Sequence, residues 1–410
     1  MGGATPPGTI PLTLQARATT LTLKPGRQPA SAIWELAAVS SSSGIRLKRG
    51  DRCEVSLRND LPAGIAPVWR GLDGAATAEP LLGHPVIPPR TTENLTISMP
   101  HAGTFMADLW LFGETMKLPV RPLPLIVEET EPIAVDRDEL FLIEDWRLTT
   151  DGTALVPGTG GGDIAPLYTV NGRAQPSFDL GSNERLRLRF ISGCQRAVVA
   201  VKIEGAEVVV VAIDGQPAEP FVARNGAFVL APGSRCDVIL DATAPPGSAS
   251  AILLHDGKEA QPIARLLTTT EPALRPSRLP PPQPLPSNEL PVRLDLKGAL
   301  RFEFNLEQAD PLGFSLLPAP AFRTKTGRTV VLTLRNPRPV ATVFRLHGHH
   351  FRLLDRLDDG WKPYWLDTLA IEPGQTQRVA FAATYPGRWL LESVATDWAA
   401  PPLVRWYAVE

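Results

Sequence analysis

Histidines are concentrated in one short segment near the C-terminus. Three of the six histidines, His347, His349 and His350, lie in the sequence Thr342-Val-Phe-Arg-Leu-His-Gly-His-His-Phe351. Because neutral imidazole is the commonest metal ligand in proteins, the cluster predicts a metal site. The competing interpretation is a group of histidines at a strand end, satisfied by ordinary hydrogen bonds. If the strand continues through the segment, Arg345, His347 and His349 share one face and His350 lies on the other.

Alternating apolar and polar residues flank this segment and predict the strands that position it. Thr329–Arg335 reads as a half-buried strand before the histidines, and Phe351–Leu354 as a second strand after them. Similar short runs, such as Arg185–Ile191, recur along the chain between turns rich in its 43 prolines and 33 glycines. We find no long run with a 3.6-residue apolar period, so the sequence predicts an all-β fold.

Composition excludes several classes of function. The 410 residues carry a net charge of -2, which argues against a broad nucleic-acid-binding surface. The apolar run Val208–Ile213 is far too short to cross a bilayer, so we expect no membrane span. Met1–Pro7 has neither a charged nor an apolar signal region, as expected if a signal peptide has been removed or never existed.

The three cysteines leave the redox compartment open. Cys53, Cys194 and Cys236 are too widely spaced for a zinc motif or a disulfide scaffold. Burial as small core residues is one interpretation. A disulfide between Cys194 and Cys236 is the other.

An internal repeat relates the two ends of the chain. Ile87–Phe105 aligns without gaps with Ile371–Trp389, and both read as a turn, an alternating strand, a glycine turn and an aromatic residue. Val68–Gly71 likewise echoes Arg345–Gly348. The first and last parts of the chain therefore look like copies of one β-sandwich.

The repeat and the composition divide the chain into three domains. We predict domains at residues 1–130, 135–272 and 290–410. Residues 273–289 contain a proline-rich run and are predicted to form a stiff, extended linker.

These features resemble the multicopper oxidases, the laccase family built from cupredoxin domains. That family carries its copper ligands in four motifs: His-Trp-His-Gly, His-x-His, His-Pro-x-His-Leu-His-Gly-His, and His-Cys-His followed by a His and usually a Met. All four places can be found here, and the text around them is retained in Gly103-Thr-Phe105, Pro124-Leu-Ile-Val127, Asp367-Thr-Leu369 and Pro386-Gly-Arg-Trp389. The resemblance implies three cupredoxin-like Greek-key β-sandwich domains in tandem.

The resemblance also implies that nearly all copper ligands are replaced. The former ligand positions hold Val68, Arg70, Asp108, Trp110, Thr342, Arg345, His347, Glu392, Ser393, Val394, Trp398 and Leu403. His347 is the one histidine retained, and His349 matches a family histidine that is not usually a ligand. Ser393 cannot supply the thiolate that a blue copper site needs, so we expect no copper cofactor and no laccase-type activity.

Four of the replacements are charged and should converge where the copper cluster used to lie. Arg70, Asp108, Arg345 and Glu392 would place two positive and two negative side chains together. Because buried charges persist only when they are paired, we predict a salt-bridge network that closes the interface of the first and third domains. The alternatives are a small polar ligand pocket, or catalysis by Asp108 and Glu392 as a carboxylate pair. Neighbouring arginines would lower carboxylate pKa values, the wrong direction for a general acid.

Within the family, this pattern most resembles a copper-free bacterial branch whose known member is an exported cell-division protein without oxidase activity. The resemblance implies a monomeric, non-enzymatic periplasmic protein, exported by the twin-arginine route and acting on an unknown protein partner of the division machinery. A second hypothesis is a residual metalloprotein or oxidoreductase with one metal around His347, using His349 or His350 with Asp108 or Glu392. Arg70 and Arg345 would repel that cation. A third is an enzyme of other chemistry in the old cavity, for which no nucleophile stands out.

Overall fold

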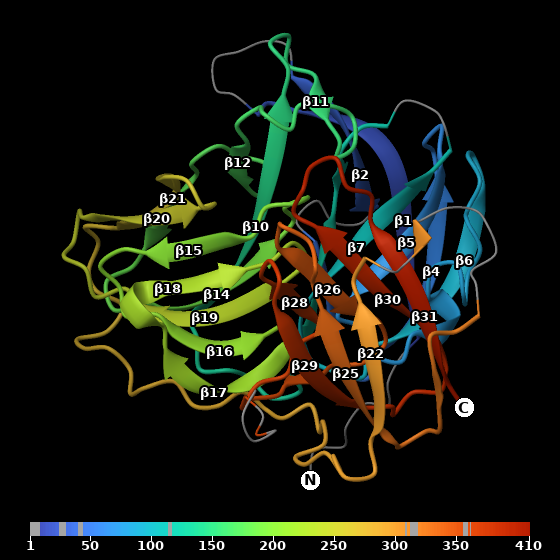
Figure 1. The fold of residues 1–410 in the computed structure, drawn as a ribbon. Helices are drawn as coiled ribbons and strands as arrows, with labels where there is room; N and C mark the ends of the chain where they lie inside the picture. The colour runs from blue at the N-terminus through green and yellow to red at the C-terminus, as the bar shows by residue number, and fades with distance from the viewer. Residues whose placement is uncertain are drawn as a thin grey trace.

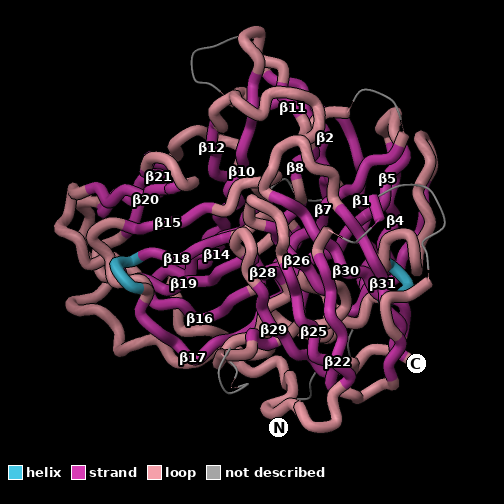
Figure 2. The backbone as a smooth tube through the Cα atoms, in the orientation of Figure 1, coloured by secondary structure: helices cyan, strands magenta, loops and turns pink. Residues whose placement is uncertain are grey.

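The computed structural model describes residues 9–23, 30–39, 44–113, 117–307, 310–311, 319–355, 360 and 362–410. The segment Met1–Pro7, which we interpreted as a mature start, lies outside them. The described chain is built of strands, with single 3-10 turns at η1 (Ala76–Ala78) and η2 (Arg224–Gly226), as Figure 2 shows. The all-β prediction is confirmed. None of the described helices is long and apolar enough to span a membrane.

The strands form three sandwiches in chain order (Figure 1). In the first, a sheet ordered β6-β4-β1-β2-β8 packs on a sheet ordered β3-β9-β7-β5. Its strands are β1 (Thr9–Leu21), β2 (Ser31–Ala38), β3 (Ile45–Lys48), β4 (Arg52–Asn59), β5 (Gly64–Arg70), β6 (Thr92–Ser98), β7 (Gly103–Phe112), β8 (Val120–Arg121) and β9 (Leu123–Glu128). Alternate residues of β4 are buried, so Val55 and Leu57 enter the core with Phe105.

The second sandwich, drawn in green to yellow in Figure 1, pairs a sheet ordered β11-β10-β14-β19-β16-β17, to which β12 adds, with a sheet ordered β13-β21-β20-β15-β18. Its strands are β10 (Arg137–Leu148), β11 (Ala154–Leu155), β12 (Leu167–Val170), β13 (Ser177–Leu180), β14 (Arg185–Ser192), β15 (Val199–Ile203), β16 (Val209–Ile213), β17 (Gln216–Val222), β18 (Ala227–Leu230), β19 (Arg235–Asp241), β20 (Ala249–His255) and β21 (Ala260–Thr268). Strand β14 is buried on both faces, and its arginines pair with acidic groups.

The third sandwich, orange to red in Figure 1, pairs a sheet ordered β22-β25-β29-β27 with a sheet ordered β23-β31-β30-β26-β28, to which β24 adds. Its strands are β22 (Leu300–Asn305), β23 (Asp310–Pro311), β24 (Arg323–Thr324), β25 (Thr329–Arg335), β26 (Thr342–Leu346), β27 (Arg352–Leu353), β28 (Thr368–Ile371), β29 (Thr376–Ala382), β30 (Gly387–Ala395) and β31 (Leu403–Val409). The sequence repeat holds here: under its alignment β6 matches β29 residue for residue, and β7 and β30 begin at matching glycines.

The histidine segment does not continue as a strand, which corrects one prediction. Strand β26 ends at Leu346, and Gly348 follows with φ 74°. A side chain at Gly348 would meet the Trp389 ring within 2.2 Å, so only glycine fits this turn. The turn breaks the alternation, and Arg345, His347 and His349 do not share one face.

The cysteines are buried and free. Cys53, Cys194 and Cys236 all lie in the core without a disulfide, so the alternative of a Cys194–Cys236 bond is wrong for this structure. Burial raises the pKa of the Cys194 and Cys236 thiols well above the usual range.

The proline-rich connector has no strand between β21 and β22, but it is held against two sandwiches. The Arg185 side chain donates to the carbonyl oxygen of Pro280 at 2.7 Å, and Arg49 donates to that of Ser287 at 2.9 Å. Leu285 packs into an apolar cluster with Val209 and Val211. The connector is therefore a docked segment of the fold, not a free spacer.

Candidate functional site

Two sheet registers bring the charged replacements together. In the third sandwich Arg345 of β26 lies directly opposite Glu392 of β30. In the first, Val68 of β5 lies opposite Asp108 of β7, and Arg70 ends β5. The side chains project toward the boundary of the two sandwiches, so the positions that the family resemblance singled out meet in space.

Glu392 is the centre of this cluster. Its Oε1 accepts from Nη1 of Arg345 at 2.8 Å, and its Oε2 accepts from Nη1 of Arg70 at 2.9 Å. The Arg70 pair crosses from the first sandwich to the third. Arg70 also reaches Asp108, with its Nη2 3.5 Å from Oδ2, while Arg345 donates to the carbonyl oxygen of Pro232 at 2.6 Å. We call Arg70, Asp108, Arg345, His347 and Glu392 the charge cluster.

His347 is held between two carboxylates. Its Nδ1 lies 2.9 Å from Oε1 of Glu79, and its Nε2 lies 3.4 Å from Oε2 of Glu392. Sequence reasoning missed Glu79, which lies in the chain after β5 and also accepts from the backbone of Leu390. With both nitrogens facing carboxylates, His347 offers no free lone pair to a metal, which counts against the residual metal site proposed around it.

Burial and neighbouring charges shift the pKa values of Glu392 and His347 in opposite directions. Burial alone would raise the pKa of Glu392, but the charges of Arg345 and Arg70 outweigh it and hold that pKa well below its usual range. Burial alone would lower the pKa of His347, but Glu79 and Glu392 outweigh it and raise the value to about 9. Glu392 is therefore a fixed anion at neutral pH and unsuited to donate a proton.

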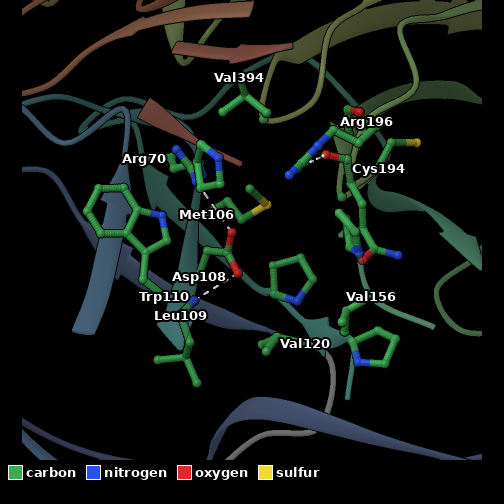
Figure 3. A pocket seen from close by; sticks show the side chains of 18 of the residues that line it. Arg70, Met106, Asp108, Leu109, Trp110, Val120, Val156, Cys194, Arg196 and Val394 are labelled. Atoms are coloured by element: carbon green, nitrogen blue, oxygen red, sulfur yellow. Dashed lines mark hydrogen bonds and ion pairs between the residues drawn. The ribbon is translucent and has the colours of Figure 1, made fainter. Parts of the chain in front are cut away.

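A cavity of about 240 Å³ opens beside the charge cluster, between the three sandwiches. Figure 3 shows Asp108 beside Arg70 on one wall and Arg196 with Cys194 on the other. Asp108 is the most exposed of the cluster carboxylates, with 26% of its side-chain surface accessible. Arg196 donates to the carbonyl oxygens of Gln195 and Ala400, so its guanidinium belongs to the wall. The cavity is small, and its lining mixes apolar side chains with charged groups that already have hydrogen-bond partners.

The remaining positions that the family resemblance singled out take part in packing and hydrogen bonds within the fold. Val68 and Trp110 pack with Leu390 and Val404 in an apolar cluster at the sandwich boundary. The hydroxyl of Thr342 donates to Asn336 at 3.1 Å, and that of Ser393 donates to the carbonyl oxygen of Leu306 at 3.0 Å. The indole of Trp398 donates to Gly160 at 2.6 Å, and Val394 and Leu403 are buried.

His349 and His350 lie outside the charge cluster. The Nδ1 of His349 lies 2.8 Å from the Tyr407 hydroxyl in the core of the third sandwich, where burial lowers its pKa to about 4. His350 instead contacts Asp73, with Nδ1 2.9 Å from Oδ1, and His101 lies beside that carboxylate. Sequence reasoning singled out neither Asp73 nor His101, because no spacing links them to His350.

Comparison with known proteins agrees with the fold and the repeat. Family models described as multicopper oxidase match residues 135–261 and 286–410, together more than half of the chain. The chain belongs to the multicopper oxidase family. No curated protein sequence matches the chain significantly.

Solved structures of the family superpose over almost the whole chain. A multicopper oxidase of Pseudomonas thermotolerans has a TM-score of 0.81 at 24% identity, covering 98% of this chain and 100% of its own. Lac15 from a marine microbial metagenome gives 0.78 at 24% identity, with the same shares covered. McoA of the hyperthermophile Aquifex aeolicus gives 0.80 at 16% identity, covering 100% of this chain and 99% of its own. These likenesses establish the shared fold of three cupredoxin-like sandwiches; the chemistry depends on the residues of the site.

Proposed function

We propose that this member of the multicopper oxidase family has no copper oxidase chemistry and acts as a structural or partner-binding protein. The observation that carries the proposal is the position of Glu392 between Arg70 and Arg345. At the place where the family pattern has His-Cys-His, the chain presents a carboxylate whose oxygens are both occupied by guanidinium groups. A copper ion there would have to displace two buried cations.

The donor set supports the same conclusion. A blue copper site takes a cysteine thiolate and histidines, and the oxygen-reducing cluster takes imidazoles. The chain offers Ser393, whose hydroxyl is bonded to a backbone carbonyl group, and His347, whose nitrogens both face carboxylates. Val68, Trp110 and Leu403 provide no ligand atoms at all.

We propose that the charge cluster takes over the structural task of the metal. It joins the first and third sandwiches through two buried pairs, Arg70 with Glu392 and His347 with Glu79, next to the Arg345 pair within the third sandwich. Removing one member of a buried pair leaves an uncompensated charge. Arg70→Ala should therefore lower the melting temperature clearly; an unchanged melting temperature would refute the structural role.

We further propose that the protein works in the bacterial cell envelope, as a monomer in the periplasm exported by the twin-arginine route, on a partner of the cell-division machinery. The support is the family membership together with the ligand replacements, which match the copper-free branch described above. The partner and its binding surface are to be found by experiment.

The decisive experiment is copper loading. Purified protein is incubated with Cu²⁺ and, separately, Cu⁺, desalted, and examined for metal content and visible absorption. We expect no blue band and no oxidase activity toward phenolic substrates; a thiolate-to-copper band or turnover would overturn the proposal. Any colourless copper that is retained is assigned with His347→Gln, since only binding at the old centre depends on that residue. Affinity capture from envelope extracts, with division proteins as the expected partners, tests the second part.

A further inference from the structure

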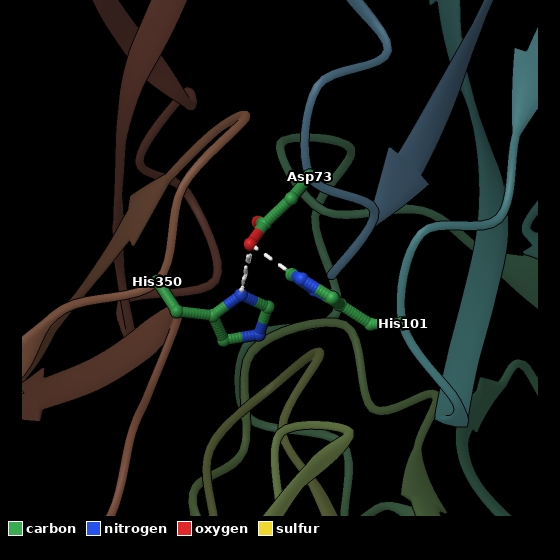
Figure 4. Close-up of side chains that lie close together, drawn as sticks. All are labelled: Asp73, His101 and His350. Carbon is green, nitrogen blue, oxygen red and sulfur yellow. Dashed lines mark hydrogen bonds and ion pairs between the residues drawn. The ribbon is translucent and has the colours of Figure 1, made fainter. Parts of the chain in front are cut away.

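Asp73, His101 and His350 form a second buried cluster, separate from the charge cluster. Asp73 follows β5, His101 lies between β6 and β7, and His350 follows the turn at Gly348. All three are at least 90% buried, with exposed fractions of 3%, 5% and 3%. Figure 4 shows both imidazoles directed at the Asp73 carboxylate. One ligand atom from each residue lies within 4.8 Å of the other two.

The hydrogen bonds of His350 fix which nitrogen faces Asp73 and which carries a proton. Its Nε2 lies 2.9 Å from the carbonyl oxygen of Asp214, which can only accept, so Nε2 is the protonated donor. Its Nδ1 is then the atom that faces both Asp73 oxygens, at 2.9 and 3.0 Å. In the neutral ring this Nδ1 is unprotonated and carries the lone pair.

A chain of hydrogen-bonded amides fixes which ring nitrogen of His101 is unprotonated. The backbone of Ala102 donates to Oδ1 of Asn288 and accepts from its Nδ2, which sets the orientation of that amide. The Nδ2 of Asn288 then donates to Oε1 of Gln216 at 2.9 Å, so the Gln216 Nε2 is the atom 3.2 Å from Nδ1 of His101. Because Nε2 of an amide donates, Nδ1 of His101 is the unprotonated ring nitrogen, and an ion bound in the cluster would take its lone pair over from Gln216.

Acceptors therefore converge in a buried place. The lone pair of His101 Nδ1 lies 3.4 Å from Oδ2 of Asp73, with no proton between them in this tautomer. A second proton on His350 satisfies its own contact with Asp73 but leaves the His101 contact repulsive. A positive centre shared by all three residues would stabilise this arrangement further, because it would also meet the His101 contact.

We propose that Asp73, His101 and His350 bind one divalent transition-metal ion, for which Zn²⁺ is the best fit. Two imidazoles and a carboxylate are a donor set that zinc accepts, and ligands about 2.1 Å from a tetrahedral ion are ~3.4 Å apart. The Asp73 oxygens lie 3.0 Å from one ring nitrogen and 3.4 Å from the other. Binding replaces any proton on Nδ1 of His350 and changes no oxidation state.

The surroundings support an ion at this place. A metal-bound histidine commonly donates its other ring N–H to a carbonyl or carboxylate, and His350 does so to Asp214, with Asp367 3.6 Å away. Arg235 pairs with Asp367 and lies 3.8 Å from Asp214, so the local acids still outnumber the guanidinium.

An ion here would tie the first sandwich to the third at a second point. Asp73 and His101 belong to the first sandwich and His350 to the third. The inference goes beyond the proposed function, because it concerns neither copper nor the former copper positions. If the zinc proposal fails, the proposal that the charge cluster binds no copper still stands.

The test uses the whole chain. Protein stripped with a chelator is incubated with ZnCl₂, desalted and measured for zinc per chain, with melting curves before and after; Co²⁺ serves as a visible probe of ligand geometry. We expect close to one zinc per chain and a melting temperature raised by roughly 2–4 °C at saturating zinc. His101→Gln should lose both effects, whereas His347→Gln, a matched change in the charge cluster, should keep them.

His101 is the best ligand to change, because its ring makes two polar contacts, with Asp73 and Gln216, besides its edge contact with the His350 ring. A wild-type protein that retains no more zinc than His101→Gln overturns the proposal. So does zinc that is lost in His347→Gln but kept in His101→Gln, which would place the ion at the former copper centre. Should His101→Gln fold poorly, the chelator-reversible shift of the wild type, with Asp73→Asn as a second variant, decides the question.

Discussion

The charge cluster and the Asp73 cluster both lie between the first and third sandwiches, and one histidine, His101, separates them in kind. In the charge cluster both nitrogens of His347 face carboxylates, and every carboxylate oxygen of Glu392 is taken by a guanidinium. In the Asp73 cluster His350 also lies between acceptors, Asp73 and the Asp214 carbonyl group, but the amide chain makes His101 present an unprotonated Nδ1 to Asp73. The presence of a histidine is thus no guide to metal binding; what its ring nitrogens contact decides.

The largest expected effect is that of Glu392→Ala. It leaves Arg70, Arg345 and a protonated His347 buried without their common partner, which should cost about 3–5 kcal/mol of unfolding free energy. Urea denaturation of the metal-free protein measures it. Glu303→Ala, an exposed glutamate in the same sandwich, is the control and should change stability by less than about 0.5 kcal/mol. A loss below ~1 kcal/mol for Glu392→Ala would remove the contrast between the clusters.

The second effect is a loss of stability at alkaline pH. The folded pKa of His347 is about 9, against the ordinary 6.5. Because folding raises the pKa, the stabilisation is complete below pH 6.5 and is lost as the pH rises to about 9, amounting to about 3 kcal/mol. Unfolding free energies at pH 6 and pH 9.5 should differ more in the wild type than in His347→Gln. Equal differences in the two proteins would mean that His347 is neutral in the folded state.

A smaller effect is expected for Arg70→Lys. The guanidinium of Arg70 reaches Glu392 through Nη1 and Asp108 through Nη2, and a single ammonium cannot keep both contacts. We expect the free energy of unfolding to fall by about 1–2 kcal/mol and zinc retention to stay unchanged. The same change at Arg58, whose side chain is 54% exposed, is the control. If Arg70→Lys altered zinc retention, the two clusters would be coupled instead of independent.

The smallest effect should come from Asp108→Asn. This carboxylate is 26% exposed, and its contact with Arg70 is 3.5 Å long, so the loss should stay within about 1 kcal/mol. The comparison is with Glu392→Gln, which makes the same chemical change at the centre of the cluster. A loss for Asp108→Asn that equals the loss for Glu392→Gln would mean that the cluster extends to the cavity wall with undiminished strength.

Sequence periodicity and the repeat were sufficient for several strands of the first and third sandwiches, because alternation reports directly on a strand with one buried face. The meeting of Arg70 with Glu392 could be expected from the family motifs, since the fold brings those motifs to one place. The histidine segment was misread at Gly348, where a packing contact with Trp389 imposes a turn that no local pattern reveals.

The Asp73 cluster could not be found from the sequence at all. His101 and His350 belong to different sandwiches, and their tautomers depend on Asn288 in the connector and on the Asp214 carbonyl group in the second sandwich. Glu79 was missed for a similar reason, because it reaches His347 only across the sandwich boundary. Contacts of this kind arise from the docking of units, on which local spacing carries no information.

The docked connector has a consequence for how the molecule comes apart. A protease must lift the segment around Pro280 and Ser287 away from Arg185 and Arg49 before its cleft can accept the backbone. Asn288 must also leave the buried amide chain with Ala102 and Gln216. Cleavage next to Asn288 therefore reports on the loss of the contacts that hold the connector to the first two sandwiches. The rate of cleavage there measures how often the protein visits this rare opened state.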